Sequence, residues 1–364
     1  MKTTSLKIEK IFASVRSDAC AVLDGRTRLL EPIRGKNLLV TGGTGFLGCW
    51  LLELLSVLNH TYSFNTSVTV ISRNSSGFLS RWPRFEGEDW LRLEDGDVRD
   101  ISEIPTSVNH IIHAAALTDR RDFSSQATSV AETNVFGTAN LLRACERLEN
   151  LEKITLMSSG LIYGKQSIDV AYIDENYSGT RSPPSGVSLY AESKRMAEAF
   201  AIAAIIESKM PIAILRPFAF VGPYQSLDSP WAITDFIRDC IHGGPIKIMG
   251  DGLTVRSIMY ASDFAYSVLA VTASGQERSI YNVGSNEGVE LLSLANQIAN
   301  SFTPKPEIQT RVGQTTHERN RLVPDTRSIE RDLGVKITVS LSDAIKKSVE
   351  WHQAMQAVSG LPAH

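Results

Sequence analysis

The stretch Thr41-Gly42-Gly43-Thr44-Gly45-Phe46-Leu47-Gly48 stands between a short apolar run over residues 37–41 and a helix-compatible run over residues 49–55. A strand, a glycine-rich turn and a helix in this order open the parallel sheets that bind dinucleotides. Glycines spaced in this way let the backbone turn sharply and approach a pyrophosphate, while the helix N-terminus offers free N–H groups to the anion. The stretch therefore predicts a βαβ unit with a dinucleotide at its turn.

Apolar runs and helical patterns alternate along the chain that follows this turn. Further buried strands are expected at residues 67–72, 90–93, 110–116, 153–159 and 212–216. Long helices are expected over residues 126–148 and 190–209. Strands that alternate with helices predict an α/β fold, namely a Rossmann-type doubly wound parallel sheet that helices cover on both faces.

The pattern changes after Pro217, where glycine, proline and short mixed segments dominate until a final helix near residues 341–355. We therefore expect a smaller C-terminal substrate-binding lobe over residues 217–364, some segments of which return to the sheet. The dinucleotide-binding Rossmann domain is expected over residues 36–216. Residues 1–35 are expected to form an N-terminal helical extension that packs on the core.

The composition excludes several classes of protein. The chain has 364 residues, 21% of them charged, and a net charge of −3, which lacks the basic excess of a nucleic-acid binder. No stretch reaches the ~20 apolar residues of a membrane span, and we expect no membrane partner. Four cysteines without CxxC spacing, and histidines without ligand spacing, predict no metal site and a reducing, cytoplasmic setting.

The end of the second expected strand indicates which dinucleotide binds. An NAD enzyme usually carries Asp or Glu there, to hold the ribose 2′-hydroxyl. This chain has Ser72, Arg73 and Asn74 instead. A carboxylate would repel a 2′-phosphate, whereas a guanidinium can bind it with two hydrogen bonds. Arg73 therefore predicts NADP(H), and the alternative is that Arg73 is an ordinary surface arginine.

Tyr190 and Lys194 begin a strong helical run and lie four residues apart, on one face of the helix. An ammonium group beside a phenol favours the phenolate and lowers its pKa from ~10. Such a phenol can exchange a proton with a carbonyl or alcohol while hydride moves to or from nicotinamide. The alternative is an exposed helix pair, because this spacing is common by chance.

Ser158 and Ser159 close the strand expected at residues 153–159. The carboxyl ends of parallel strands line the ligand crevice of such sheets, so a hydroxyl there can hydrogen-bond the reacting oxygen. The alternative is that these serines only satisfy local backbone groups. The glycine turn, the serine pair and the Tyr–Lys pair occur in this order at sheet ends, and together they predict a dehydrogenase site.

These motifs resemble the extended short-chain dehydrogenase/reductase superfamily, in its nucleotide-sugar epimerase/dehydratase branch, over roughly residues 36–355. The matching segments are residues 41–48, Gly96-Asp97-Val98, His113-Ala114-Ala115-Ala116, Asn134 within residues 133–138, Ser158–Gly164, Tyr190 with Lys194, Arg216-Pro217 and Gly250-Asp251-Gly252. The resemblance implies a homodimer formed through the helices at residues 126–148 and 190–209.

The residues argued above from the turn, the strand ends and the Tyr–Lys pair, together with those that the resemblance adds, give the full set of expected site residues. The expected catalytic residues are Ser159, Tyr190 and Lys194. The cofactor contacts are Gly42, Thr44, Gly45, Phe46, Leu47, Gly48, Arg73, Asp97, Val98, Ala114, Ala115, Ala116, Asn134, Tyr190, Lys194, Pro217 and Phe218. The substrate contacts are Thr118, Ser159 and Arg256, the last of which matches the arginine that holds the diphosphate of the nucleotide sugar.

Departures from the family pattern narrow the reaction. Dehydratases and decarboxylases of this branch carry acidic residues after the catalytic serine or threonine, whereas this chain has Gly160-Leu161. Ala219 replaces the asparagine that the epimerases carry after the sixth strand. The segments at residues 218–225 and 256–264 are similar to bacterial nucleotide 4-keto-6-deoxysugar reductases. We therefore expect a reductase rather than a dehydratase or a decarboxylase.

Three hypotheses follow for the function. The first is an NADPH-dependent reductase that acts on C4 of a nucleotide-linked 4-keto-6-deoxyhexose, with Tyr190 as proton donor. The second is a nucleotide-sugar C4 epimerase with tightly bound NAD, which would use the same three residues. The third is a non-catalytic NADP-binding sensor or scaffold, a class that usually loses the tyrosine or the lysine.

Overall fold

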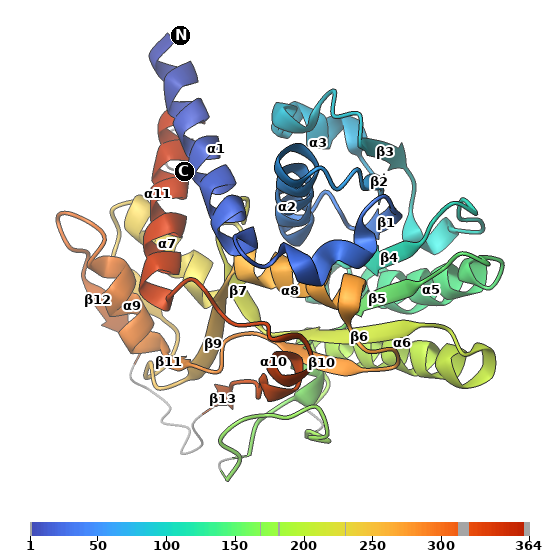
Figure 1. The fold of residues 1–364 in the computed structure, drawn as a ribbon. Coiled ribbons are helices and arrows are strands. Elements are labelled where there is room, and N and C mark those ends of the chain that lie inside the picture. Colours follow the sequence, from blue (N-terminus) through green and yellow to red (C-terminus); the bar gives the residue numbers. More distant parts are fainter. Residues whose placement is uncertain (1, 168, 181–182, 230, 312–319, 360–364) are drawn as a thin grey trace.

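A seven-stranded sheet forms the centre of the described part of the chain (Figure 1). The computed structural model describes residues 2–167, 169–180, 183–229, 231–311 and 320–359. The sheet contains β1 (Asn37–Thr41), β2 (Ser67–Ser72), β3 (Leu91–Asp95), β4 (His110–His113), β5 (Lys153–Met157), β6 (Ile212–Pro217) and β10 (Ile280–Val283). Its order is β10-β6-β5-β4-β1-β2-β3, and each neighbouring pair is parallel. The expected α/β doubly wound parallel sheet is confirmed.

Helices cover both faces of this sheet, which explains why its central strands are apolar on both sides. On one face lie α2 (Phe46–Tyr62) and α8 (Ala261–Ser274), in the larger of the two main hydrophobic clusters. On the other face lie α5 (Ala127–Cys145) and α6 (Gly186–Ser208), which pack against each other and on β4, β5 and β6. The short helix α3 (Ser75–Arg81) follows β2.

Short elements between the strands carry several expected site residues. They are the 3-10 helices η2 (Pro83–Phe85), η3 (Val98–Asp100) and η4 (Gly160–Tyr163) and the short helix α4 (Asp122–Ser125). Each of η3, α4 and η4 comes soon after the carboxyl end of a strand. They therefore lie where open parallel sheets bind their ligands.

The chain after β6 builds a second group of elements beside the main sheet. A smaller sheet contains β7 (Ala219–Val221), β9 (Val255–Tyr260), β11 (Gly288–Glu290) and β13 (Arg321–Leu322), and β8 (Ile246–Ile248) pairs with β12 (Ile308–Thr310). The accompanying helices are α7 (Ala232–Ile241), α9 (Leu291–Ala299), α10 (Arg327–Leu333) and α11 (Leu341–Ser359). Two elements of this stretch belong to the main sheet instead: β10 is its edge strand, and α8 packs on one of its faces.

The N-terminal segment forms helix α1 (Lys2–Leu23) and the 3-10 helix η1 (Thr27–Ile33). Helix α1 packs on α2, α8 and α11, and it lies beside α11 in Figure 1. Phe12 contacts the rings of Trp82 and Trp351 edge-on, with centroids 6.2 and 5.7 Å away. The buried carboxylate of Asp18 accepts hydrogen bonds from Tyr260 (2.7 Å) and Lys347 (2.6 Å). The extension is therefore part of the core.

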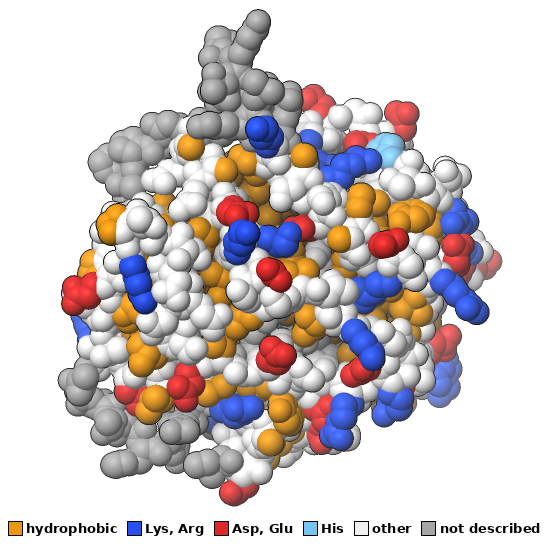
Figure 2. Space-filling model, turned by 60° about the vertical axis from the view of Figure 1, so that its left-hand side comes forward, with side chains coloured by type: hydrophobic (Ala, Val, Ile, Leu, Met, Phe, Trp, Pro, Cys, Tyr) orange, Lys and Arg blue, Asp and Glu red, His pale blue; other side chains and the backbone are white. Residues whose placement is uncertain are grey.

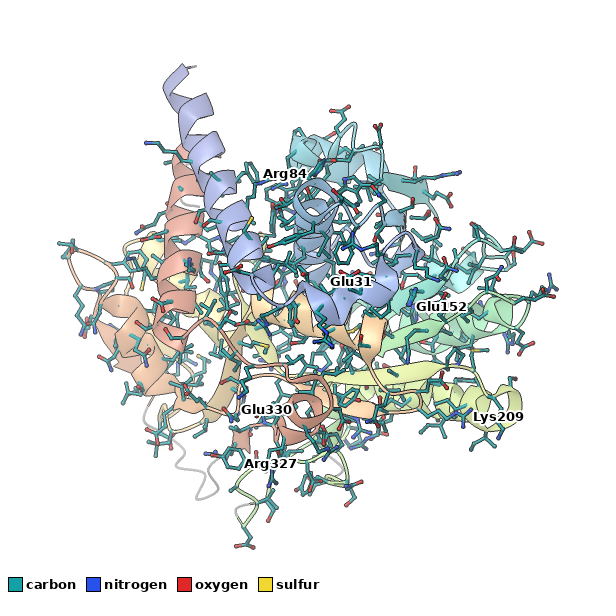
Figure 3. All side chains as sticks on the ribbon, in the orientation of Figure 1. Glu31, Arg84, Glu152, Lys209, Arg327 and Glu330 are labelled. Carbon is teal, nitrogen blue, oxygen red and sulfur yellow. The ribbon has the colours of Figure 1, made fainter. Side chains whose placement is uncertain are left out.

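A buried ion pair joins α2 to the segment after α3. Glu53 is fully buried, and the guanidinium of Arg84 lies 2.5 Å from its Oε1 atom. Figure 3 labels Arg84, which lies between α1 and the helices of the Rossmann unit. Tyr224 also donates a hydrogen bond to Glu53. The pair therefore connects the first βαβ unit to the segment that follows β7.

Charged side chains and free thiols are spread over the described part of the chain. Basic and acidic side chains are interspersed over the face drawn in Figure 2, with apolar side chains between them. All four cysteines are free; Cys49, Cys145 and Cys240 are buried and Cys20 is partly exposed. In the described segments, no helix combines the length and apolar character needed to cross a lipid bilayer.

Candidate active site

The glycine-rich turn fits tightly against neighbouring backbone. Gly42 has a φ of 76°, and a Cβ placed there would lie 2.7 Å from the carbonyl group of Ala114. A Cβ at Gly48 would lie 2.2 Å from the carbonyl carbon of Gly43. Both positions therefore require glycine, which brings α2 close to the end of β1.

The N-terminus of α2 faces this turn and carries no side-chain cap. Gly45 is its N-cap residue and the helix begins at Phe46. The first N–H groups of a helix have no partner within it, and they carry partial positive charge. Together with the glycine cradle, this end of α2 fits the pyrophosphate of a dinucleotide.

A buried histidine ties the turn to β4. The Oγ1 atom of Thr41 lies 2.7 Å from Nδ1 of His113, and Nε2 of His113 lies 3.1 Å from Oγ1 of Thr138. The N–H of Ala115 donates to the Thr41 hydroxyl at 3.3 Å. Burial, and next the charge of Lys194, lower the pKa of His113 to about 3. His113 is therefore a neutral structural residue that positions the alanine run after β4.

Arg73 is exposed at the end of β2. The hydroxyl groups of Ser72 and Thr44 lie 3.0 Å apart and connect this end to the glycine turn. At the end of the neighbouring strand, Asp97 accepts hydrogen bonds from the side chain of Arg99 at 3.0 and 2.8 Å. These bonds, with a smaller contribution from the charge of Arg73, hold the pKa of Asp97 below its usual value. Arg73 and Asp97 therefore follow the ends of two neighbouring strands, in which Ser72 lies opposite Asp95.

The three expected catalytic residues converge on the end of β5. Ser159 caps η4, accepting a 3.1 Å hydrogen bond from the N–H of Leu161, and its hydroxyl is hydrogen-bonded to Tyr190. The Tyr190 ring stacks on Phe123 with centroids 4.5 Å apart. One turn along α6, the ammonium group of Lys194 donates to the carbonyl oxygen of Met157 at 2.9 Å. All three side chains are buried.

One expectation about this group is wrong in the structure. The sequence predicted that Lys194 lowers the pKa of Tyr190, but burial raises the pKa of Tyr190 well above its ordinary value, and the Ser159 hydrogen bond opposes this only in part. Desolvation disfavours the phenolate, and the ammonium group is directed to the Met157 carbonyl rather than to the phenol. The phenol of Tyr190 is therefore neutral, which is the form that carries a proton.

Asn134 connects α5 to the turn of α6 that carries these residues. Its Nδ2 atom donates to the hydroxyl of Ser193 at 2.9 Å, and that hydroxyl donates to the carbonyl oxygen of Tyr190 at 2.8 Å. The Oδ1 atom of Asn134 is buried without a hydrogen-bond partner. An unpaired buried acceptor of this kind is unfavourable, and it suits a ligand or water that donates to it.

Val98 and Phe218 are fixed by packing. Val98 is buried against Gly137 of α5, where a Cβ would lie 2.8 Å from the valine side chain. Phe218 packs with Ile162 and Tyr163 behind the Ser159 turn, and Pro217 ends β6 just before it. The expected cofactor contacts of Val98, Pro217 and Phe218 stay predictions.

Arg256 lies on β9, with its Nη1 atom directed to the carbonyl oxygens of Val255 (2.8 Å) and Asn320 (3.3 Å). Burial, and next the positive charge of Arg120, lower the pKa of Arg256 to about 10. Arg120 also lies 5.8 Å above the ring of Trp231. Arg120 is exposed in the loop between β4 and α4, and the sequence pattern did not mark it as a site residue.

The remaining expected contacts lie in the loop after β4. Ala114, Ala115 and Ala116 are partly exposed, directly beyond the strand, and Thr118 is exposed. These residues come directly after His113, the last residue of β4. They lie beside the glycine turn, because β4 pairs with β1 and Ala114 contacts Gly42. The loop therefore leads from the glycine turn toward Phe123, the residue on which Tyr190 stacks.

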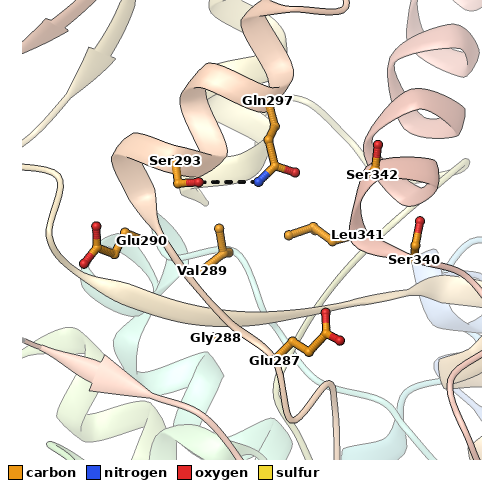
Figure 4. A pocket seen from close by; sticks show the side chains of 9 residues that line it. All are labelled: Glu287, Gly288, Val289, Glu290, Ser293, Gln297, Ser340, Leu341 and Ser342. Atoms are coloured by element: carbon orange, nitrogen blue, oxygen red, sulfur yellow. Dashed lines mark hydrogen bonds between the residues drawn. The ribbon is translucent and has the colours of Figure 1, made fainter.

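A separate cavity of about 560 Å³ lies between β11, α9 and the start of α11 (Figure 4). Its lining includes Glu287, Glu290 and Ser340, and along α9 Gln297 donates to Ser293 at 3.5 Å. None of the expected catalytic, cofactor-binding or substrate-binding residues lines this cavity. It is therefore distinct from the site at the end of β5.

The doubly wound sheet, the glycine turn and the Ser–Tyr–Lys group define an oxidoreductase-type enzyme that uses a nicotinamide dinucleotide. The chain belongs to the NAD dependent epimerase/dehydratase family, whose model matches residues 38–284. This confirms the family that the sequence motifs indicated.

Characterised relatives modify nucleotide sugars. UDP-glucuronic acid decarboxylase 1 of Xenopus tropicalis is 23% identical over 351 residues, which cover 95% of this chain and 80% of the relative. The dTDP-glucose 4,6-dehydratase of Streptomyces niveus is 26% identical, with 88% and 94% covered. A crystal structure of a dTDP-glucose 4,6-dehydratase from Streptomyces venezuelae, with NAD bound, has a TM-score of 0.75 and 26% identity, over 88% of this chain and 98% of that one.

Proposed function

We propose that this enzyme reduces the C4 carbonyl of a nucleotide-linked 4-keto-6-deoxyhexose with NADPH. The observation that carries the proposal is the buried group of Ser159, Tyr190 and Lys194 at the end of β5, beside a glycine turn that fits a dinucleotide. Its relatives act on nucleotide sugars, as their names state. These two facts support a nucleotide-sugar substrate.

In the proposed reaction, each residue of the group has one task. Bound NADPH supplies the hydride that C4 receives. Tyr190 donates its phenolic proton to the carbonyl oxygen, so that the ketone becomes a secondary alcohol. Ser159 hydrogen-bonds the same oxygen. Lys194 is proposed to hold the nicotinamide ribose and to offset part of the cost of the buried phenolate that remains. Arg256, in the expected substrate-binding lobe over residues 217–364, is proposed to hold the nucleotide diphosphate.

The turn after β5 supports a reductase over a dehydratase or a decarboxylase. Those enzymes need an acidic side chain directly after the catalytic serine or threonine. Here a Cβ at Gly160 would already lie 3.0 Å from the ring of Phe218. A carboxylate at this position would require Phe218 to move, so the packing itself argues against an acid–base pair there.

Arg73 supports NADP(H) as the cofactor. It is exposed at the end of β2, where a guanidinium is available to the 2′-phosphate of the adenosine ribose. The relative from Streptomyces venezuelae has NAD bound, which supports the alternative of a C4 epimerase that retains NAD. Heat denaturation of the purified enzyme separates the two hypotheses, because only the epimerase is expected to release a stoichiometric amount of NAD.

The direct test mixes the purified enzyme with NADPH and a dTDP- or UDP-linked 4-keto-6-deoxyglucose. We expect the NADPH absorbance to fall and a 6-deoxyhexose nucleotide to form in equal amount. If the absorbance stays constant with both nucleotides, the reductase proposal is wrong. Binding of NADPH without turnover of any sugar nucleotide would favour the non-catalytic sensor or scaffold.

We also propose a homodimer that pairs α5 and α6 with the same helices of a second copy. Large apolar side chains are exposed on these helices, namely Phe136 (56%), Met196 (50%), Ile202 (42%) and Ile206 (65%). Exposed apolar area of this kind is typical of protein–protein contacts. Light scattering should give twice the 39.9 kDa chain mass, and Ile206→Glu should reduce it to the chain mass.

A further inference from the structure

A buried ion pair lies directly behind the proposed catalytic lysine. Glu198 is one helical turn beyond Lys194 on α6, and both side chains are 4% exposed. Arg216, on β6, donates from Nε to Oε1 of Glu198 at 3.0 Å and from Nη2 to Oε2 at 2.7 Å. This two-pronged contact fixes the position of the carboxylate.

The guanidinium of Arg216 is itself held by a second set of contacts. Its Nη1 atom donates to the hydroxyl of Tyr163 and to the carbonyl oxygen of Glu175, each at 2.8 Å. The Tyr163 hydroxyl in turn donates to Oδ1 of Asn282 on β10 at 2.8 Å. Arg216 therefore donates from all three of its nitrogen atoms, and turning away from Glu198 would leave buried groups unpaired.

The charged and titratable groups around Lys194 come from several packed elements. On its own helix they are Tyr190 and Glu198. From β4 the side chain is His113, which is neutral, and from β5 the contact is only the Met157 carbonyl oxygen. Burial lowers the pKa of Lys194 to about 8, and the negative charge of Glu198 opposes that decrease. Of the groups named here in the described part of the chain, only Glu198 is negatively charged.

We propose that Glu198 is a positioning residue that keeps Lys194 cationic at neutral pH, and that Arg216 holds Glu198 in place for this task. The inference rests on the proposed function only in assuming that the cation of Lys194 assists Tyr190. Its core statement concerns the charge of one buried amine, which can be measured without any substrate.

The test compares Glu198→Gln with the matched variant Glu192→Gln. Glu192 lies on the same helix, but it is half exposed and pairs with Arg195 instead of facing Lys194. Nuclear magnetic resonance of lysine-labelled protein follows the ammonium titration, with the Lys194 signal assigned by its loss in Lys194→Met. We expect the midpoint to fall by about one pH unit or more in Glu198→Gln, because a nearby opposite charge favours the charged form. The midpoint should stay in place in Glu192→Gln.

The pH dependence of activity should shift in the same direction as the Lys194 midpoint. A cationic Lys194 is needed, so activity is lost as the pH rises through its pKa. A lower pKa therefore moves the alkaline limb of the kcat profile to lower pH in Glu198→Gln. Glu198→Asp keeps the negative charge, so its alkaline limb should lie close to the pH of the wild-type limb. A purely structural role of Glu198 would not produce this rescue.

Each outcome decides one statement. An unchanged Lys194 midpoint in folded Glu198→Gln overturns the inference. A shifted midpoint supports it, even if the wild-type enzyme fails to oxidise NADPH with 4-keto sugars, in which case only the proposed function is lost. Should Glu198→Gln not fold, the uncharged variant Glu198→Met replaces it, and a Lys194 midpoint that stays in place there overturns the inference equally.

Discussion

The phenol of Tyr190 is packed on Phe123 and hydrogen-bonded to Ser159, so its chemistry can be removed without removing its volume. Tyr190→Phe should lower kcat by ~10²- to 10⁴-fold, the usual contribution of a positioned proton donor. The affinity for NADPH, measured by fluorescence titration, should change little. Tyr172→Phe, at an exposed position, is the control. A variant that retains wild-type kcat would show that Tyr190 is not the donor.

Arg73 has a single expected partner, the 2′-phosphate of the cofactor. Arg73→Ala should weaken NADPH binding by ~10- to 100-fold, since a hydrogen bond to a charged group contributes ~1.5–3 kcal/mol. NADH binding should be unaffected. Calorimetric titration with both cofactors measures this, and Arg92→Ala, at an exposed arginine on β3, serves as the control. Equal losses for both cofactors would contradict a role in 2′-phosphate recognition.

The sequence could predict the members of the site but not their charge states. The motif spacing placed Ser159, Tyr190 and Lys194 together, and the structure agrees. It could not give the direction of the pKa of Tyr190, because that depends on burial by Phe123 and on the Met157 carbonyl that binds Lys194. Local sequence describes neighbours along a helix, whereas desolvation depends on every element packed around it.

At the level of the element, two glycines of the turn before α2 are expected to differ in their tolerance of a side chain. A Cβ at Gly48 would lie 2.2 Å from backbone atoms of Gly43, whereas at Gly45 the closest atom is the Gly42 carbonyl oxygen at 3.3 Å. Gly48→Ala should therefore destabilise the fold by ~1–3 kcal/mol, as overpacked sites do, and abolish NADPH binding. Gly45→Ala should cost less.

Urea unfolding followed by circular dichroism measures the two free energies of unfolding, and fluorescence titration measures NADPH binding. Equal stability of the two alanine variants would show that the close approach of Gly43 and Gly48 does not constrain the turn. Loss of binding in Gly48→Ala, with normal stability, would instead indicate an effect on the cofactor alone.

Most strands of the main sheet could be predicted, because they are short apolar runs followed by glycine or a small residue. The expected run at residues 67–72 coincides with β2, and that at residues 212–216 with β6, which extends one residue further. β10 was missed as a member of this sheet. Its four residues include the buried Asn282, and its pairing with β6 joins segments more than 60 residues apart, which no local pattern reveals.

At the scale of the whole molecule, Asp18 connects both ends of the chain to the second sheet. Its carboxylate binds Tyr260 at the end of β9 and Lys347 on α11. Asp18→Ala should lower the free energy of unfolding by ~3–5 kcal/mol, the usual cost of breaking a buried pair. Asp24→Ala, an exposed carboxylate just after α1, should change it by less than ~0.5 kcal/mol.

Denaturant unfolding of the two variants tests this expectation. Equal midpoints for Asp18→Ala and Asp24→Ala would mean that α1 docks through its apolar residues alone. The link itself could not be predicted from the sequence, because Asp18 and Tyr260 are separated by 242 positions. The same holds for Glu198 and Arg216, which lie on α6 and β6.

The distribution of thiols has a practical consequence. Burial raises the pKa of Cys49, Cys145 and Cys240 well above the ordinary value for a thiol, so these three react slowly with alkylating reagents at neutral pH. Cys20, partly exposed on α1, is left as the accessible site. A maleimide fluorophore added under native conditions would therefore label one helix, and its emission would report whether α1 stays docked when nucleotides bind.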